Sequence, residues 1–129
     1  TEILEALARR HWPERPDARA EMLFLYRRFR MLLLTRHVPL ASVSAALTPE
    51  GAEASLRLLA AFLRRVEGIA SPSIGLLGVN PHAGEIGGDE ETRALRPAID
   101  RLNAEGLARL SDPLPADAAF RGFDAADPA

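Results

Sequence analysis

The stretch SIGLLGVNPHAGEIGGDEE, residues 73–91, decides the fold of this chain. Its first part, Ile74 to Val79, is apolar or glycine on both faces, which predicts a buried strand. Asn80-Pro81 ends that strand, because the residue before a proline is disfavoured in the helical region. Gly88 to Glu91 predicts a helix start, where the helix dipole favours acidic side chains. The loop between strand and helix lies where open α/β sheets bind ligands, so it is the first candidate site.

The rest of the chain alternates between predicted helices and strands. Helices are predicted over residues 1–10, 40–47, 49–67 and 89–105, the last interrupted near Arg96 by Pro97, and a short one over 116–120. Strands are predicted over residues 29–35, which we expect to be central, and over 107–110. This alternation predicts one α/β domain, residues 1–129, with a mostly parallel sheet flanked by helices.

Composition limits the function classes. The 129 residues are 47% hydrophobic and 26% charged, as in an ordinary globular domain. Sixteen basic and eighteen acidic residues give a net charge of −2, which argues against binding to nucleic acid or to an anionic membrane. Cysteine is absent, so thiolate metal sites and a cysteine nucleophile are excluded. No signal peptide or membrane span is evident, and we expect a cytoplasmic protein.

The three histidines differ in their surroundings. His11 is next to Trp12 at the end of the first predicted helix and has no assigned role. His37 and His82 each follow a predicted strand and each neighbour a proline. If those strands are adjacent and parallel, both imidazoles reach one edge of the sheet, where they could bind a divalent metal. The alternative is that both are solvent-exposed or hydrogen-bonded loop residues, which is the commoner situation for histidines without a fixed-spacing motif.

Acidic residues and glycines offer weaker signals than the histidines. Glu85 and Asp117 are the acids with the most suggestive positions, whereas Asp89 to Glu91 suit the first turn of a helix. The glycines at 84, 87 and 88 could present backbone N–H groups to an anion. Their spacing matches neither a dinucleotide-binding nor a P-loop motif, and turn geometry explains them better.

Three segments together carry a resemblance to a known family. They are TRHVPL (residues 35–40), GVNPHAGEIGGDEE (78–91) and DPLPADAAF (112–120). In order and approximate spacing they resemble segments of the 4-hydroxythreonine-4-phosphate dehydrogenases, enzymes of pyridoxal phosphate biosynthesis, and the opening Thr1-Glu2 is similar to the end of a further family segment. The resemblance spans the chain but covers well under half of a family protein, so we expect the central part of a longer two-domain enzyme.

The resemblance implies a set of site residues. Family members hold a divalent metal (Zn, Co or Mg) with three histidines, two of which correspond to His37 and His82; the third corresponds to no residue of this chain. Thr1 corresponds to a substrate contact, and Asp117 to an acid beside the active site with a catalytic role. The resemblance also implies NAD as cofactor, oxidation and decarboxylation of 4-phosphohydroxy-L-threonine, a homodimer, and an isocitrate/isopropylmalate dehydrogenase-like α/β fold. The isolated 129 residues are expected to be inactive.

Two departures from the family pattern leave alternatives open. Arg36 precedes His37 where the family usually has threonine, and Asp112 replaces a glycine. They suggest a second hypothesis, a related dehydrogenase acting on another hydroxy substrate such as a dihydrodiol or a sugar-acid phosphate. A third hypothesis is a non-catalytic α/β dimerisation or ligand-binding module.

Overall fold

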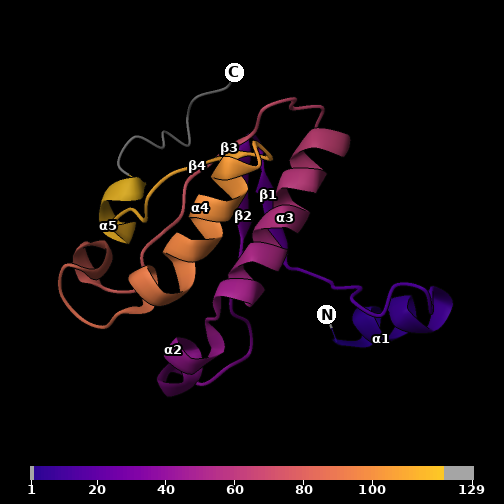
Figure 1. Ribbon diagram of the computed structural model, residues 1–129, viewed down its shortest axis with the longest axis horizontal. Coiled ribbons are helices and arrows are strands. Elements are labelled where there is room, and N and C mark those ends of the chain that lie inside the picture. Colours follow the sequence, from indigo (N-terminus) through magenta and orange to yellow (C-terminus); the bar gives the residue numbers. More distant parts are fainter. Residues whose placement is uncertain (1, 121–129) are drawn as a thin grey trace. The chain divides into compact units, whose positions relative to one another are not determined.

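The computed structural model describes residues 2–120 and divides the chain into two compact units, residues 1–36 and 37–129. The elements, labelled in Figure 1 where there is room, are α1 (Glu2–His11), β1 (Leu23–Tyr26), β2 (Phe29–Leu32), η1 (Leu40–Ser42), α2 (Val43–Ala46), α3 (Pro49–Arg65), β3 (Ser73–Ile74), η2 (Pro81–Gly84), η3 (Glu91–Leu95), α4 (Arg96–Ala104), β4 (Arg109–Leu110) and α5 (Ala116–Ala119). No described helix is both long enough and apolar enough to cross a membrane. The organisation into one domain stays a prediction.

The first unit contains helix α1 and a β-hairpin. Strands β1 and β2 pair antiparallel, with Tyr26 opposite Phe29 across a two-residue turn. Arg27 in that turn has a φ of 49°, as two-residue hairpin turns require. The sequence predicted a central strand in a mostly parallel sheet for residues 29–35. That prediction was wrong in partner and length, because the short Arg27-Arg28 connection allows only antiparallel pairing and the strand ends at Leu32.

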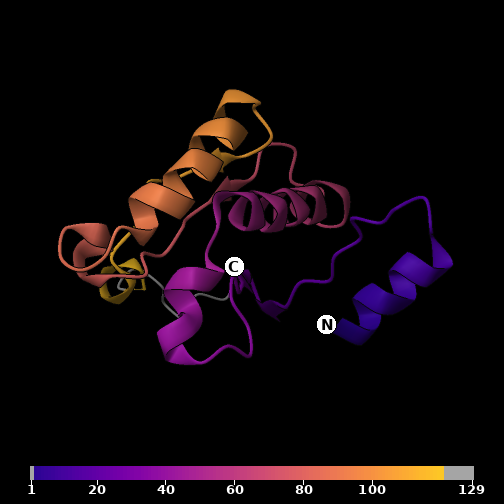
Figure 2. The ribbon, with the colours of Figure 1, turned by 60° about the horizontal axis from the view of Figure 1, so that its bottom comes forward.

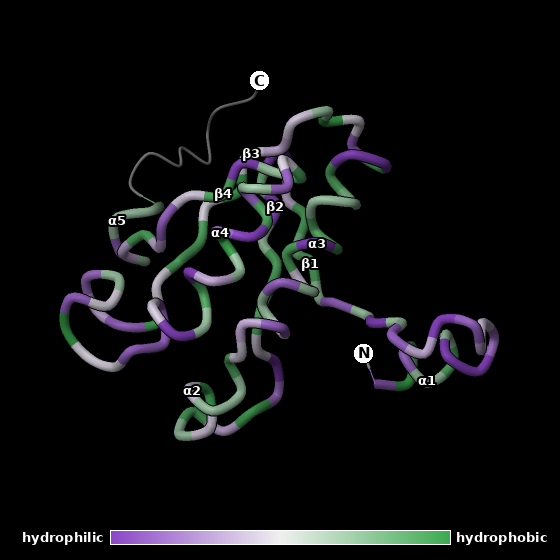
Figure 3. Tube along the Cα trace, viewed as in Figure 1, coloured by the Kyte–Doolittle hydropathy of each residue, from purple (hydrophilic) through white to green (hydrophobic). Residues whose placement is uncertain are grey.

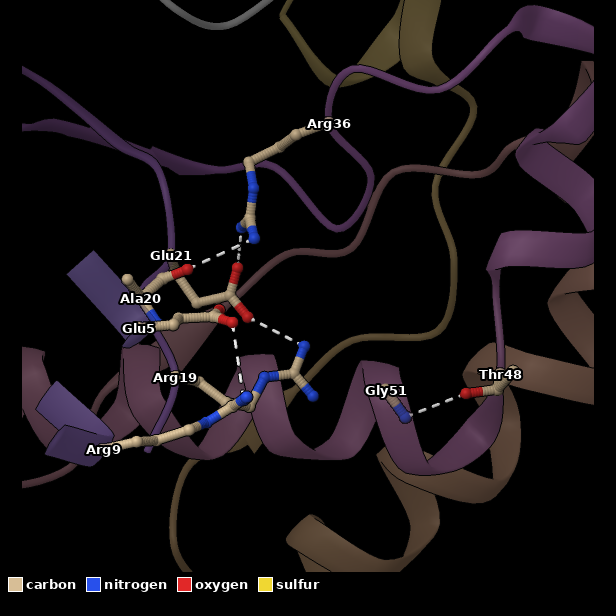
Figure 4. A network of polar contacts seen from close by, with 8 residues as sticks. All are labelled: Glu5, Arg9, Arg19, Ala20, Glu21, Arg36, Thr48 and Gly51. Carbon is tan, nitrogen blue, oxygen red and sulfur yellow. Dashed lines mark hydrogen bonds and ion pairs between the residues drawn. The ribbon is translucent and has the colours of Figure 1, made fainter. Parts of the chain in front are cut away.

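Ion pairs and hydrogen bonds join the elements of this first unit (Figure 4). The Glu5 carboxylate of α1 accepts a hydrogen bond of 3.1 Å from the backbone N–H of Ala20. Glu21 is paired with Arg19 at 3.1 Å and with Arg36, whose guanidinium also donates to the Ala20 carbonyl. Arg36 therefore has partners inside its own unit.

In the second unit, α3 begins and ends at local signals that the sequence carries. The Thr48 hydroxyl accepts a hydrogen bond of 3.0 Å from the Gly51 N–H, also drawn in Figure 4, and Pro49 occupies the first turn. Gly68, beyond the last turn, has a φ of 72°. The predicted start is confirmed, and the helix ends at Arg65, two residues before the predicted end. Val66, inside the predicted range, is 69% exposed because the helix ends one residue before it.

Helices α3 and α4 lie side by side in both Figure 1 and Figure 2 and enclose the core of this unit. Their buried apolar side chains include Leu56, Leu59, Leu63, Ala98, Ile99 and Leu102. At the rim, Arg57 donates to Glu105 at 2.6 Å and Arg101 donates to Glu53 at 2.8 Å. The hydrogen-bonding pattern changes at Arg96, next to Pro97, as predicted. Hydrophobic burial along a helix pair, with ion pairs at its edge, holds the second unit together.

Strands β3 and β4 form a short parallel pair, with Ile74 opposite Leu110. An isolated parallel bridge joins Leu77 to Leu114 further along. The predicted strand over residues 74–79 is thus shorter than expected, since between these points Leu76 donates to the Ser111 hydroxyl instead of continuing the ladder. Parallel pairing is confirmed here, but the described residues contain one parallel and one antiparallel pair of strands in separate sheets and no mostly parallel layer.

Candidate functional site

The candidate loop leaves the sheet at Asn80-Pro81, as predicted, and forms the 3-10 turn η2. Inside this turn His82 and Ala83 have φ values of 53° and 55°, in the left-handed region that non-glycine residues seldom adopt. His82 is exposed. Figure 3 shows this loop, at the left beside α4, as largely hydrophilic. The turn therefore exposes the His82 imidazole to solvent, and its backbone adopts a conformation that is intrinsically unfavourable for these two residues.

Glu91, the first residue of η3, is buried and binds the start of the loop through its carboxylate. It is 2% exposed, and its Oε1 accepts hydrogen bonds from the backbone N–H groups of Val79 at 2.6 Å and Asn80 at 2.7 Å. Its Oε2 accepts from the Asn80 side-chain amide at 3.0 Å. Burial would raise the pKa of Glu91, but the hydrogen bonds from Asn80 and Val79 outweigh it and lower the pKa below the usual value. The buried carboxylate is thus held ionised.

Glu90 adds a second anchor to the same loop. It is 8% exposed and accepts a hydrogen bond of 2.6 Å from the Asn80 side-chain amide. Hydrogen bonds from Ser44 and then from Asn80 lower the pKa of Glu90 to about 2. The sequence placed Glu90 and Glu91 in an ordinary helix first turn and missed their role. The sequence offered one signal for this role: two acidic residues that follow closely after a strand end, where backbone N–H groups need acceptors.

The close packing of this loop depends on glycine. A Cβ on Gly78 would lie 2.8 Å from the Ala83 Cα, and a Cβ on Gly84 would lie 3.0 Å from Glu91 Oε2. Gly84 also has a φ of 97°. Side chains at these positions would separate the turn from the carboxylate that anchors it.

His37, the other histidine predicted to bind metal, belongs to the second unit together with His82. It is exposed and, like His82, has a left-handed backbone, with a φ of 52°. Neither imidazole makes a hydrogen bond or ion pair with another residue of the described range 2–120. The strands that precede the two histidines do not pair with each other as predicted, because β2 pairs antiparallel with β1 and β3 pairs parallel with β4. Within residues 2–120, no three His, Cys, Asp or Glu side chains gather as a metal site.

Of the remaining predicted site residues, one lies near the end of the described range and one outside it. Asp117 is exposed in the first turn of α5. Thr1, predicted to contact substrate, lies outside the described residues. Asp112, one of the two departures from the family pattern, forms an ion pair of 3.0 Å with Arg96. Glu85 is exposed beside η2.

Comparison with known proteins gives one consistent result. Residues 1–127 match the family model described as "Pyridoxal phosphate biosynthetic protein PdxA". A curated 4-hydroxythreonine-4-phosphate dehydrogenase from Azoarcus sp. is 53% identical over 93 residues, which cover 70% of this chain and 28% of that protein. Another with the same name, from Stenotrophomonas maltophilia, is 49% identical over 102 residues, covering 74% of this chain and 31% of that protein. The chain spans about a third of the length of these relatives.

Solved structures agree. A crystal structure of a 4-hydroxythreonine-4-phosphate dehydrogenase from Burkholderia phymatum superposes with a TM-score of 0.72 at 31% identity, covering 78% of this chain and 31% of that one. A second, from Klebsiella pneumoniae, superposes with a TM-score of 0.71 at 35% identity over the same shares of the two chains.

Proposed function

This chain belongs to the PdxA family of pyridoxal phosphate biosynthetic proteins, and from that membership we propose that it is the central part of a longer, two-domain dehydrogenase. The proposed reaction is the NAD-dependent oxidation, with decarboxylation, of 4-phosphohydroxy-L-threonine. Support for the substrate comes from relatives named 4-hydroxythreonine-4-phosphate dehydrogenase. Support for a larger chain comes from the share of those relatives, about a third, that this chain covers. We further propose a cytoplasmic homodimer with an isocitrate dehydrogenase-like fold.

His37 and His82 are the residues that would hold a divalent metal ion. Both imidazoles are exposed and neither is hydrogen-bonded within the described residues, so their ring nitrogens are available as ligands. Imidazole suits zinc and cobalt better than magnesium, which prefers oxygen ligands. A metal bound here would lower the pKa of the substrate hydroxyl while NAD accepts the hydride. A third ligand would come from outside the described residues, since these contain no three-residue metal cluster.

The other residues of this chain have supporting roles in the proposal. Asp117, exposed at the start of α5, would orient a ligand or move a proton. Thr1 would contact the substrate. The oxidised product is a β-keto acid, which loses carbon dioxide readily.

The observation that carries this proposal is the shared backbone conformation of the two histidines. Residues other than glycine seldom adopt a positive φ, and such strained residues cluster at functional sites. Of the three histidines in the chain, His37 and His82 have φ values of 52° and 53°, whereas His11 lies in helix α1.

The test replaces each histidine in the full-length protein by alanine. We expect His37→Ala and His82→Ala each to lose bound metal and to lower kcat for NAD reduction by at least about a hundredfold, because each substitution removes one of the proposed metal ligands. His11→Ala is the matched control, because His11 packs edge-to-face against Trp12 and should not affect metal content. Unchanged metal content in His37→Ala and His82→Ala would instead favour the non-catalytic module. The purified 129-residue chain alone should reduce no NAD.

The second enzyme hypothesis, another hydroxy substrate, loses much of its motive. Arg36 and Asp112 suggested it, but Arg36 pairs with Glu21 and Asp112 pairs with Arg96. Both departures thus have partners within the chain. Comparing kcat/KM of the full-length protein for phosphorylated hydroxythreonine and for a dihydrodiol distinguishes the two hypotheses.

A further inference from the structure

The His82 turn needs an external support. His82 and Ala83 are consecutive non-glycine residues in the left-handed region, with φ/ψ of 53°/29° and 55°/40°. Each such residue costs free energy relative to the right-handed conformation. Two backbone hydrogen bonds of the turn are long, 3.2 Å from Ala83 N–H to the Asn80 carbonyl and 3.4 Å from Glu85 N–H to the His82 carbonyl. Contacts from outside the turn therefore matter for holding it in this conformation.

Glu91 contacts the turn at both of its ends. At the entry it accepts from the N–H groups of Val79 and Asn80, and at the exit its carboxylate lies against Gly84, where a Cβ would come within 3.0 Å. Glu91 is itself fixed to the core, because Ala94 and Leu95 in the same segment η3 are completely buried. The side chain therefore connects the packed interior to the two ends of the turn.

From this geometry we propose that Glu91 is a positioning residue, which holds the left-handed turn in the conformation that presents His82 to a metal ion. The inference rests on the proposed function in one respect, the role of His82 as a ligand. Glu91 touches neither the imidazole nor the metal in this proposal. It acts through the backbone of residues 79–84. The Asn80 side chain adds to this anchoring, because its amide donates hydrogen bonds to both Glu90 and Glu91.

The test is a titration of the metal-free full-length protein with Co²⁺ alone, followed by the visible absorption of the bound ion. Glu91→Gln should weaken Co²⁺ binding by about tenfold, the lower end of the loss seen when groups that orient a metal ligand are removed, and should alter the spectrum because the His82 ring is no longer fixed. Asp89→Asn is the matched control. It removes the same charge two residues away, but from an exposed side chain whose ion pair with Arg93 is 3.4 Å long, and should change affinity by less than twofold.

The spectrum separates positioning from a general loss of stability, because a less stable protein with an intact site binds Co²⁺ with the same spectrum. If Glu91→Gln does not fold, Asn80→Ala replaces it, since that variant keeps both backbone hydrogen bonds to Glu91 and should weaken binding a few-fold. Wild-type affinity and spectrum in the folded variant, or an equal loss in Asp89→Asn, would overturn the role of Glu91.

A parallel titration of His82→Ala distinguishes the two levels of the proposal. Loss of binding in His82→Ala together with wild-type binding in Glu91→Gln rejects only the positioning role. Wild-type Co²⁺ binding in His82→Ala rejects the proposed function and, with it, the positioning role of Glu91.

Discussion

Replacing Glu91 by glutamine should destabilise the second unit, independently of any metal. The substitution keeps the shape of the side chain and removes its charge. An amide oxygen at the Oε1 position can still accept from the N–H groups of Val79 and Asn80, which now lie 2.6 and 2.7 Å from the carboxylate. The amide nitrogen of the new glutamine then faces the Asn80 side-chain N–H group, so two donors oppose each other. Rotating the Asn80 amide would not help, because its oxygen would then face the Glu90 carboxylate, to which Asn80 now donates.

The magnitude follows from these three contacts. Changing two hydrogen bonds from charged to neutral acceptors costs about 1 kcal/mol each, and losing the third costs about 1 kcal/mol more. The neutral side chain is easier to bury, which offsets part of this sum. Because the pKa of Glu91 is lowered despite its burial, the hydrogen bonds outweigh the cost of burying the charge. We expect a net loss of about 2 kcal/mol, a large share of the 5–15 kcal/mol typical of a domain.

The assay is chemical denaturation followed by circular dichroism. Circular dichroism is preferred to fluorescence because the single tryptophan, Trp12, belongs to the first unit and the substitution lies in the second. Asp89→Asn serves as the control and should lie within about 0.5 kcal/mol of wild type, as expected for an exposed ion pair. A loss for Glu91→Gln no larger than that of the control would refute the claim that its hydrogen bonds stabilise the loop.

Two further predictions concern pH and the core. The pKa of Glu90 is about 2 in the folded chain against an ordinary 4.5, so its carboxylate stabilises the fold above pH 4.5 and loses that contribution as the pH falls toward 2. In denaturation curves measured at several pH values, Glu90→Gln should therefore flatten the decline of stability over this interval. An unchanged slope would contradict the prediction. Leu102→Ala, at a completely buried position, should lower the free energy of unfolding by about 3 kcal/mol, whereas Leu58→Ala, at a position 41% exposed, should lower it by about 1 kcal/mol. Equal losses in the two variants would contradict the burial of Leu102 between the helices.

Local signals predicted the helices of the second unit well. Thr48 and Pro49 fix the start of α3, Gly68 marks its end, and Pro97 changes the helix at Arg96, because each of these effects depends on residues within one turn. The exception, Val66, follows the same logic, since an apolar stripe continued past the end of a helix no longer predicts burial.

Strand pairing and the interior of the site could not be predicted in the same way. The apolar run after Phe29 fits a central parallel strand and a hairpin strand equally well, and the Arg27 turn decides between them. Glu91 looked like any acid at a helix start. Its partners Val79 and Asn80 lie 12 and 11 residues away, so its role depends on the chain path between them. The sequence predicted His37 and His82 as metal ligands, first from their positions after strands and then from the family resemblance, but their left-handed backbones were visible only in the structure.

The position of the two carboxylates also changes the interpretation of the loop glycines. Glycine N–H groups before a helix can bind an external anion, which the sequence left open for residues 84, 87 and 88. In the structure the carboxylates of Glu90 and Glu91 already occupy this region: a Cβ on Gly88 would lie 2.2 Å from Glu90 Oε2, and one on Gly84 3.0 Å from Glu91 Oε2. With the pKa of both acids lowered, two negative charges lie in the segment that carries His82. Such a segment repels a phosphate and attracts a cation, which favours the proposed metal site in this loop over an anion site.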